Sequence, residues 1–291
     1  MRQAATSAAV FKSKAREALS DPALQQAMDR AKDGFVGARR NVIEDLPEFD
    51  SLRDTARDIK DHVLNHLDLY LEHYERKTIE NGGHVHWAQT TEEACQIIKK
   101  ICLDADARLV AKGKSMVSEE MGLNSVLEEA GIEVAETDLG EYIIQLAGEL
   151  PSHIIAPAIH KTREQITELF YENHSSHGFS ERVTRREAIV NEARSVLRSV
   201  FARADVGITG ANFLIAESGA NVIVTNEGNG DLSSTLPRVQ IITAGIEKVI
   251  PSLDDLSTFL RILGRSATGQ EMSAYTTLYT CLLYTSPSPR D

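Results

Sequence analysis

Two lysines and a hydroxyl stand next to one another where a predicted strand passes into a predicted helix. Lys112, Lys114 and Ser115 flank Gly113 in the sequence KGKS. A phosphate-binding loop also needs a glycine five positions before Gly113, where Arg108 stands, so the segment does not predict nucleotide hydrolysis. Ammonium and hydroxyl groups at a helix start still suit a carboxylate or a phosphate. We therefore expect Lys112, Lys114 and Ser115 to line a pocket for such a ligand, with exposed turn lysines as the alternative.

A second group of polar residues lies in the most glycine-punctuated part of the chain, between residues 205 and 230. Glu217, Asn226 and Glu227 stand at the ends of predicted strands, where open α/β sheets bind ligands. We expect these three side chains to line a pocket, with tight turns and solvated carboxylates as the alternative. The neighbouring glycines lack the GxGxxG spacing, because Ser233 stands in the third place, and this argues against dinucleotide binding.

The histidines offer one candidate for a binding site and no metal centre. His160 follows a predicted strand and precedes a predicted helix, where a pocket residue would stand. His62 and His66 are one helical turn apart but have no carboxylate in register, so a solvated helix face is favoured. His84 and His86 share one side of a predicted strand, where burial at a sheet end is favoured over chelation. We expect no metal site in this chain.

The cysteines do not have the spacing of metal ligands. Cys95, Cys102 and Cys281 form no CxxC pair, so the chain is not expected to hold a cysteine-ligated zinc ion or iron–sulfur cluster by itself. An odd number of cysteines without a secretory signal is typical of reduced thiols, and we expect Cys95 and Cys102 to pack as small apolar residues.

Composition excludes several classes of protein. The 291 residues are 42% hydrophobic and 25% charged, as in ordinary globular proteins. No apolar run is long enough to span a bilayer, and no secretory signal opens the chain, so we expect a cytoplasmic protein without a transmembrane segment. The formal net charge is −12, and an acidic body repels phosphates. No nucleic-acid partner is expected.

Hydrophobic periodicity predicts the elements that must position these residues. Residues 1–80 have a helical pattern, with one apolar stripe on a long helix from Phe49 to about Ile79. Short apolar runs then alternate with capped helices, which predicts an α/β fold with a mainly parallel sheet covered on both faces. The strands are predicted at 84–88, 108–111, 132–135, 153–156, 205–209, 221–225 and 239–243. Residues 279–291 have no periodicity and are expected to be a non-native tail.

Several long strings of sequence carry a family likeness. They include GGHVHWA at 82–88, ETDLGEYIIQ at 136–145 and GITGANF at 207–213. Further strings are KSMV with EE at 114–120, PSHIIAPAIHK at 151–161, NEGNG at 226–230, TLP at 235–237 and GIEKV at 245–249. In these segments, and in order as far as about Leu278, the chain resembles the lactate utilisation protein B family.

The resemblance implies a fold and a role. It implies a LUD domain at 81–278, similar to the sugar-isomerase and CoA-transferase-like α/β fold, after an N-terminal helical arm at 1–80. It also implies the front portion of an iron–sulfur electron-transfer subunit that works with other lactate-utilisation subunits to oxidise L-lactate to pyruvate. The resemblance implies two [4Fe–4S] clusters in the full-length parent. Since this chain lacks the cysteine motifs that bind them, they are expected outside it. Redox activity is therefore not expected of this chain alone.

Two other functions stay open. In CoA-transferases of similar fold, a glutamate at a strand end forms an acyl adduct, and Glu217 would be its counterpart in an acyl- or CoA-transferring enzyme. Alternatively, the chain is a structural module that docks partners through the long helix from Phe49.

Overall fold

The computed structural model describes residues 8–154 and 156–280. They fall into two compact units, and each unit is assembled from separated stretches of chain. The first unit comprises the described residues up to 37 together with 91–210 and 229–243. The second comprises 38–90, 211–228 and the described residues from 244 onward. The domain boundaries expected near residues 80 and 278 stay a prediction.

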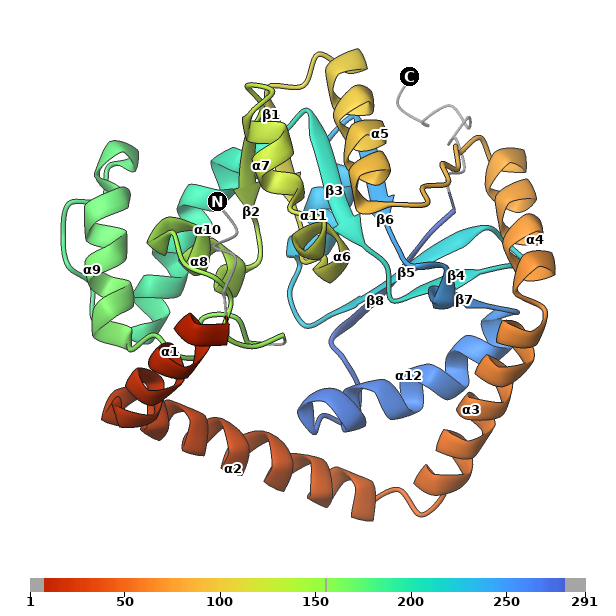
Figure 1. Cartoon of the computed structure of the whole chain (residues 1–291), viewed down its shortest axis with the longest axis horizontal. Helices are drawn as coiled ribbons and strands as arrows, with labels where there is room; N and C mark the ends of the chain where they lie inside the picture. Colours follow the sequence, from red (N-terminus) through yellow and green to blue (C-terminus); the bar gives the residue numbers. More distant parts are fainter. Residues whose placement is uncertain (1–7, 155, 281–291) are drawn as a thin grey trace, which may run out of the picture. The chain divides into compact units, whose positions relative to one another are not determined.

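The first unit is built on a parallel sheet. The strands are β1 (Leu109–Lys112), β2 (Glu133–Glu136), β3 (Val206–Gly210) and β6 (Val239–Thr243). Their order is β2-β1-β3-β6, and every neighbouring pair is parallel (Figure 1). Because the strands run the same way, their carboxyl ends meet at one edge of the sheet. The predicted α/β class with a parallel sheet is confirmed here.

Helices cover both faces of this sheet. They are α5 (Thr91–Asp104), α6 (Met116–Glu120), α7 (Leu123–Glu128), α8 (Leu139–Ala147), α9 (Arg163–Asn173), α10 (Arg186–Arg203) and α11 (Asn229–Thr235). Successive residues of β1 point to opposite faces. Val110 packs in one core cluster with Cys102 and Leu127, from α5 and α7. Ala111 packs in another with Ile143 and Val196, from α8 and α10.

The second unit has a mixed sheet that the sequence did not predict as such. Its strands are β4 (Phe213–Ile215), β5 (Ala220–Thr225), β7 (Val249–Ile250) and β8 (Tyr275–Tyr279). The order is β7-β4-β5-β8, with β5 antiparallel to both of its neighbours and β4 parallel to β7. Residue 279 of the predicted tail is thus the last residue of β8, and residues 281–291 lie outside the described residues.

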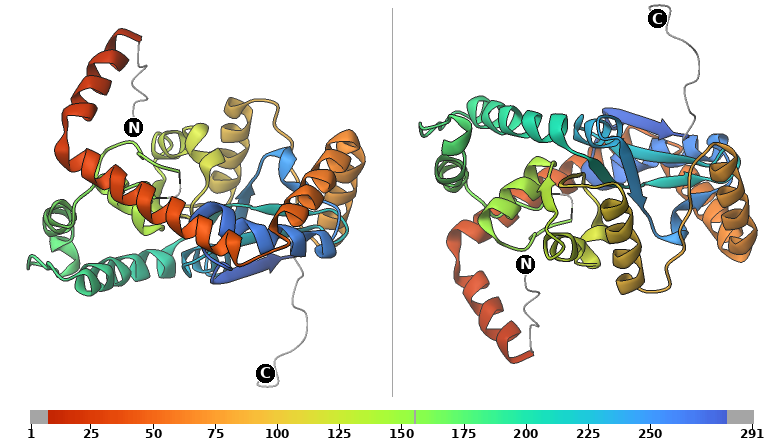
Figure 2. Two further views of the ribbon diagram at one scale, coloured as in Figure 1. Left: turned by 90° about the horizontal axis from the view of Figure 1, so that it is seen from below. Right: turned by 90° about the horizontal axis from the view of Figure 1, so that it is seen from above.

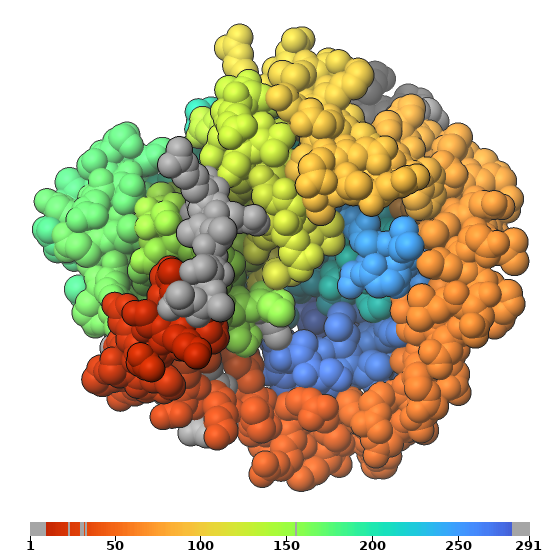
Figure 3. Space-filling model, in the orientation of Figure 1, coloured from red at the N-terminus to blue at the C-terminus, as the bar shows by residue number. Residues whose placement is uncertain are grey.

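Three helices accompany this mixed sheet. They are α3 (Phe49–Asn65), α4 (Leu67–Glu80) and α12 (Leu253–Thr268), and α12 lies beside α3 (Figure 2). Ala56 of α3 and Phe259 of α12 share a core cluster with Phe213 of β4. Helices α3 and α4 present open surface (Figure 3). Leu69 and Ile79 of α4 are exposed.

The predicted helical character of the N-terminal region is confirmed, with one interruption. Helices α1 (Ala8–Ser20) and α2 (Pro22–Glu44) precede α3 and α4. The single helix predicted from Phe49 to about Ile79 breaks at His66. The His66 ring nitrogen Nδ1 lies 2.9 Å from the carbonyl oxygen of His62, and the His66 backbone N–H instead donates to Val63. This side-chain competition for the helical acceptor ends the first helix.

Two predicted strands, at 84–88 and 153–156, are wrong, because their described residues have no strand structure. In the first segment, the Trp87 ring N–H donates to Glu75 of α4 over 2.9 Å, so the segment is held by a side chain instead of a ladder. In the second, the His153 ring accepts a hydrogen bond from the backbone N–H three residues later, a local bond that competes with strand pairing.

Candidate functional site

Polar side chains gather at the carboxyl edge of the first unit's sheet. Lys112, Glu136 and Thr243 are the last residues of β1, β2 and β6, and Thr209 is the last but one of β3. All four are buried. Carboxyl ends of parallel strands are the usual place for ligands in open α/β sheets, so the candidate site is built here.

Lys112 is neutralised within the chain. It is the register partner of Glu136 across the β1–β2 pair, and its ammonium group contacts the Glu136 carboxylate directly. Asn124 also donates to Glu136 Oε1 over 2.7 Å. A buried ion demands such partners, because its hydration is lost on folding. The side chain of Lys112 is fully buried, and its positive charge is balanced by the carboxylate of Glu136.

Ser115 takes part in a buried hydroxyl network. Its Oγ accepts the backbone N–H of Ser118 and so caps α6. The same oxygen lies 2.8 Å from Oγ1 of Thr243, and Ser118 Oγ lies 3.0 Å from that threonine oxygen. Ser115 thereby ties the start of α6 to the end of β6.

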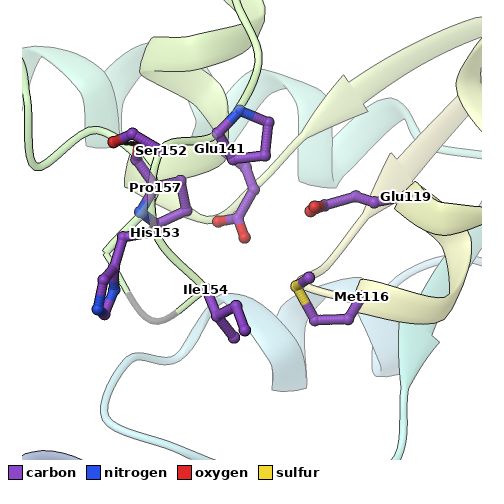
Figure 4. A pocket seen from close by; sticks show the side chains of 8 residues that line it. Met116, Glu119, Glu141, Ser152, His153, Ile154 and Pro157 are labelled. Atoms are coloured by element: carbon purple, nitrogen blue, oxygen red, sulfur yellow. Dashed lines mark hydrogen bonds between the residues drawn. The ribbon is translucent and has the colours of Figure 1, made fainter. Parts of the chain in front are cut away.

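A cavity of about 160 Å³ opens beside this network. Figure 4 shows the carboxyl groups of Glu119, from α6, and Glu141, from α8, pointing toward one another across it. The residues that line it are Met116, Glu119, Glu141, Pro151, Ser152, His153, Ile154 and Pro157. The cavity therefore combines two acids with largely apolar walls.

Burial perturbs both carboxyl groups. Glu141 is 5% exposed, and its carboxyl oxygens form no hydrogen bond of normal geometry with the described chain, although the Asp138 carboxyl group is close. Burial, together with the neighbouring Asp138, raises the pKa of Glu141 to about 9, against the opposing effect of Lys114, whose Nζ is 3.7 Å from Oε1. Burial also raises the pKa of Glu119. The raised pKa favours the protonated form of Glu141 at neutral pH.

His160 lies behind the wall of the cavity and does not line it. One ring nitrogen lies 2.6 Å from Ser152 Oγ, and the other lies 2.9 Å from Glu149 Oε2. Because Ser152 does line the cavity, His160 positions one of its wall residues. Its predicted contact with a ligand stays a prediction.

Glu217, Asn226 and Glu227 belong to the second unit and form local contacts there. Glu217 Oε1 accepts the backbone N–H of Leu253, the first residue of α12, over 2.9 Å. Asn226 donates to Gln270 over 2.8 Å and accepts the Ala274 N–H over 3.0 Å. Glu227 is exposed, and its backbone N–H donates to the preceding threonine at 225.

The two acids of the cavity were missed as site residues in the sequence. Glu141 stands three residues after Asp138, the spacing of a helix-capping box. This pattern explains Asp138 and Glu141 without any ligand. The structure shows half of that box: Asp138 accepts the Gly140 N–H over 2.9 Å, whereas Glu141 turns into the cavity. The available signal was an acidic residue, Glu141, in the first turn of a helix that is otherwise rich in apolar residues.

Most of the chain matches the model of a known protein family. The family model of the LUD domain matches residues 71–290. This chain belongs to the LUD domain family. Its resemblance to lactate utilisation protein B, read from the sequence strings, is confirmed by curated relatives of that name.

The relatives of this LUD chain are longer than the chain itself. Lactate utilization protein B of Bacillus velezensis is 42% identical over 94% of this chain and 56% of its own length. That of Bacillus subtilis is 40% identical over 93% of the chain and 56% of its length. An uncharacterized electron transport protein of Escherichia coli is 40% identical over 94% of the chain and 57% of its own length. The chain thus spans about half the length of the relatives it matches, and no solved structure matches it.

The described cysteines of the LUD chain do not fit an iron–sulfur cluster. Cys95 and Cys102 lie in the core of the first unit, and burial raises the pKa of the Cys102 thiol to about 11. A cluster ligand must be a thiolate, which this environment disfavours. Within residues 8–154 and 156–280, no group of three or more His, Cys, Asp or Glu is arranged to hold a metal ion. Cys281 lies outside the described residues.

The same residues contain no helix that is both long and apolar enough to cross a bilayer.

Proposed function

We propose that this chain is the LUD portion of an iron–sulfur electron-transfer subunit that serves the oxidation of L-lactate to pyruvate. The observation that carries the proposal is the 40–42% identity, over nearly the whole chain, to proteins named for lactate utilization and for electron transport. The subunit would work in the cytoplasm with other lactate-utilisation subunits.

In this proposal the two [4Fe–4S] clusters belong to a part of the parent protein outside this chain. The burial of Cys95 and Cys102 in an apolar core supports this division of labour, since neither thiol can reach an inorganic centre at the surface. The LUD portion then contributes a scaffold, a small-molecule cavity and docking surface, and the electron path runs through the rest of the parent.

The acyl-transfer alternative is not favoured by the geometry. Glu217 accepts a hydrogen bond from the first N–H of α12, at the positive end of the helix dipole, so this carboxylate has a structural task. A nucleophilic carboxylate attacks an acyl group through one oxygen, and an accepted hydrogen bond makes the carboxylate a weaker nucleophile.

Genetic complementation tests the proposal. The source reading frame is first extended to obtain the parent, in which we expect two CxxCxxCxxxCP runs. Parent, chain and a parent variant with serine at those cysteines are then expressed in Bacillus subtilis lacking its lactate utilization protein B. We expect growth on L-lactate to return with the parent alone. A soluble parent that leaves lactate growth unrestored contradicts the proposal, and so does restoration by the cysteine-free variant.

A further inference from the structure

The cavity of the first unit contains buried acceptors without donors. Both oxygens of Glu141 and Oε1 of Glu119 are buried, and none of them forms a hydrogen bond of normal geometry with the described residues. Buried carboxyl oxygens are nearly always hydrogen-bonded in folded proteins, because an unmade bond costs about 1–3 kcal/mol or more. Since both groups point into one cavity, a ligand that donates hydrogen bonds would satisfy them together (Figure 4).

The charges around the cavity favour a cation over an anion. Lys112 is matched by Glu136, and Lys114 is within 3.7 Å of Glu141. Glu119 and Asp138 then remain as acids for which the described chain shows no ion pair with a basic side chain. The titratable groups on the surrounding elements are Lys112 on β1, Lys114 before α6, Glu119 on α6, Glu136 on β2, Asp138 and Glu141 at α8, and His153 in the following loop. With a neutral histidine, this set carries more negative than positive charge.

The walls favour an organic cation over a metal ion. Met116, Pro151, Ile154 and Pro157 contribute apolar surface to the lining. A hydrated divalent ion prefers several oxygen ligands in a wet site, whereas an aliphatic ammonium ion uses both apolar walls and acidic ends.

We propose that this cavity binds a small aliphatic amine in its protonated form, with the ammonium group between the carboxylates of Glu119 and Glu141. The alkyl part packs against Met116 and the two prolines. The residues of the site all belong to the first unit.

Binding of the ammonium ion is coupled to the loss of a proton from Glu141. At neutral pH, before the ligand binds, the raised pKa of about 9 favours the protonated form of Glu141. When the ammonium ion enters, this proton leaves to solvent and the carboxylate accepts a hydrogen bond from the ligand. Affinity therefore rises with pH until the amine itself loses its proton, near pH 10 for an alkylamine of about the basicity of lysine.

Calorimetry with three matched probes tests the proposal. The full chain is titrated at pH 7 with butylammonium, butanol and butyrate, and butylammonium is repeated in two buffers of different ionisation enthalpy. We expect binding of butylammonium only, with release of close to one proton. Butyrate binding in its place overturns the proposal in favour of an anion site at the lysines. A divalent-ion titration with Mn²⁺ that displaces butylammonium overturns it in favour of a metal site, and absence of butylammonium binding also overturns it.

Variants locate the site. We expect Glu141→Gln and Glu119→Gln each to weaken butylammonium binding roughly ten- to hundredfold, the usual effect of losing a charge-assisted hydrogen bond. Glu128→Gln is the matched control, because Glu128 is exposed at the end of α7 and does not line the cavity. Circular dichroism establishes that each variant is folded. Folded Glu119 and Glu141 variants with unchanged affinity contradict the placement, whatever the wild-type result.

Discussion

Two sets of buried ionisable side chains in the first unit are hydrogen-bonded among themselves, whereas the carboxyl oxygens of Glu141 form no hydrogen bond of normal geometry with the described chain. Lys112 and Glu136 form one such set. A second set is formed by Tyr142, His174 and Glu192: the tyrosine hydroxyl lies 2.8 Å from His174 Nε2, and His174 Nδ1 lies 2.8 Å from Glu192 Oε1. The contrast supports a ligand role for Glu141, since the chain supplies partners wherever the buried group is structural.

The histidine of this second set makes stability depend on pH. Burial lowers the pKa of His174, although Glu192 opposes the shift. The folded state therefore keeps His174 neutral, while the unfolded chain takes up a proton below about pH 6.5. Because the unfolded state binds more protons there, the free energy of unfolding falls as pH drops from about 6.5 toward the lowered pKa of the folded state.

Urea unfolding between pH 7.5 and 5 measures this dependence. We expect His174→Phe to be less stable overall but to show a smaller loss of stability on acidification than the wild type. His62→Phe is a control, because His62 is exposed on α3. A wild type that becomes more stable on acidification would mean that His174 is charged against Glu192, contrary to this account.

The strand–helix alternation of the first unit could be predicted because each element repeats a strong local pattern. Strands β1, β2, β3 and β6 were predicted within a residue or two, since each is a buried apolar run bounded by helix starts. Strands β4 and β7 were missed because they have three and two residues, too few for any periodicity. The antiparallel pairing of β5 was also missed, since partner and direction are set by tertiary contacts.

The candidate site was predicted in part for the same reason. Position at a strand end could be read from the sequence, and Lys112, Lys114 and Ser115 do lie at or just after the end of β1; that they line a ligand pocket stays a prediction. The direction in which a side chain points could not be predicted from the sequence, so Glu119 and Glu141 were missed as cavity residues. The pairing of Lys112 with Glu136 depends on the β1–β2 register, which no local pattern reports.

Helix α11 packs directly on β3 at Gly207. A Cβ atom at this position would lie 1.7 Å from the carbonyl oxygen of Ser233, which is backbone and cannot rotate away. We expect Gly207→Ala to lower the free energy of unfolding by about 1–3 kcal/mol or more, as in overpacked cores. Gly34→Ala is the control, because Gly34 lies within α2 with open space around it and should be neutral or slightly stabilising. Equal effects of the two substitutions in urea unfolding would contradict the close packing.

At the scale of the whole molecule, the chain is a LUD domain that covers about half the length of its relatives. Each of its two units has its own sheet and its own core clusters. Under the function proposed above, this LUD portion would offer a cavity and surfaces, and the clusters would belong to the rest of the parent. Such a division predicts that the chain is folded and colourless by itself.

The most direct measurement of this central claim compares the chain and its parent after anaerobic purification from cells that overproduce the cluster-assembly machinery. Iron and sulfide are determined chemically, and electron paramagnetic resonance spectra are recorded after reduction with dithionite. The account predicts two [4Fe–4S] clusters in each parent molecule and neither iron nor a cluster signal in the folded chain. A brown, paramagnetic chain, or a folded parent without iron, would contradict it.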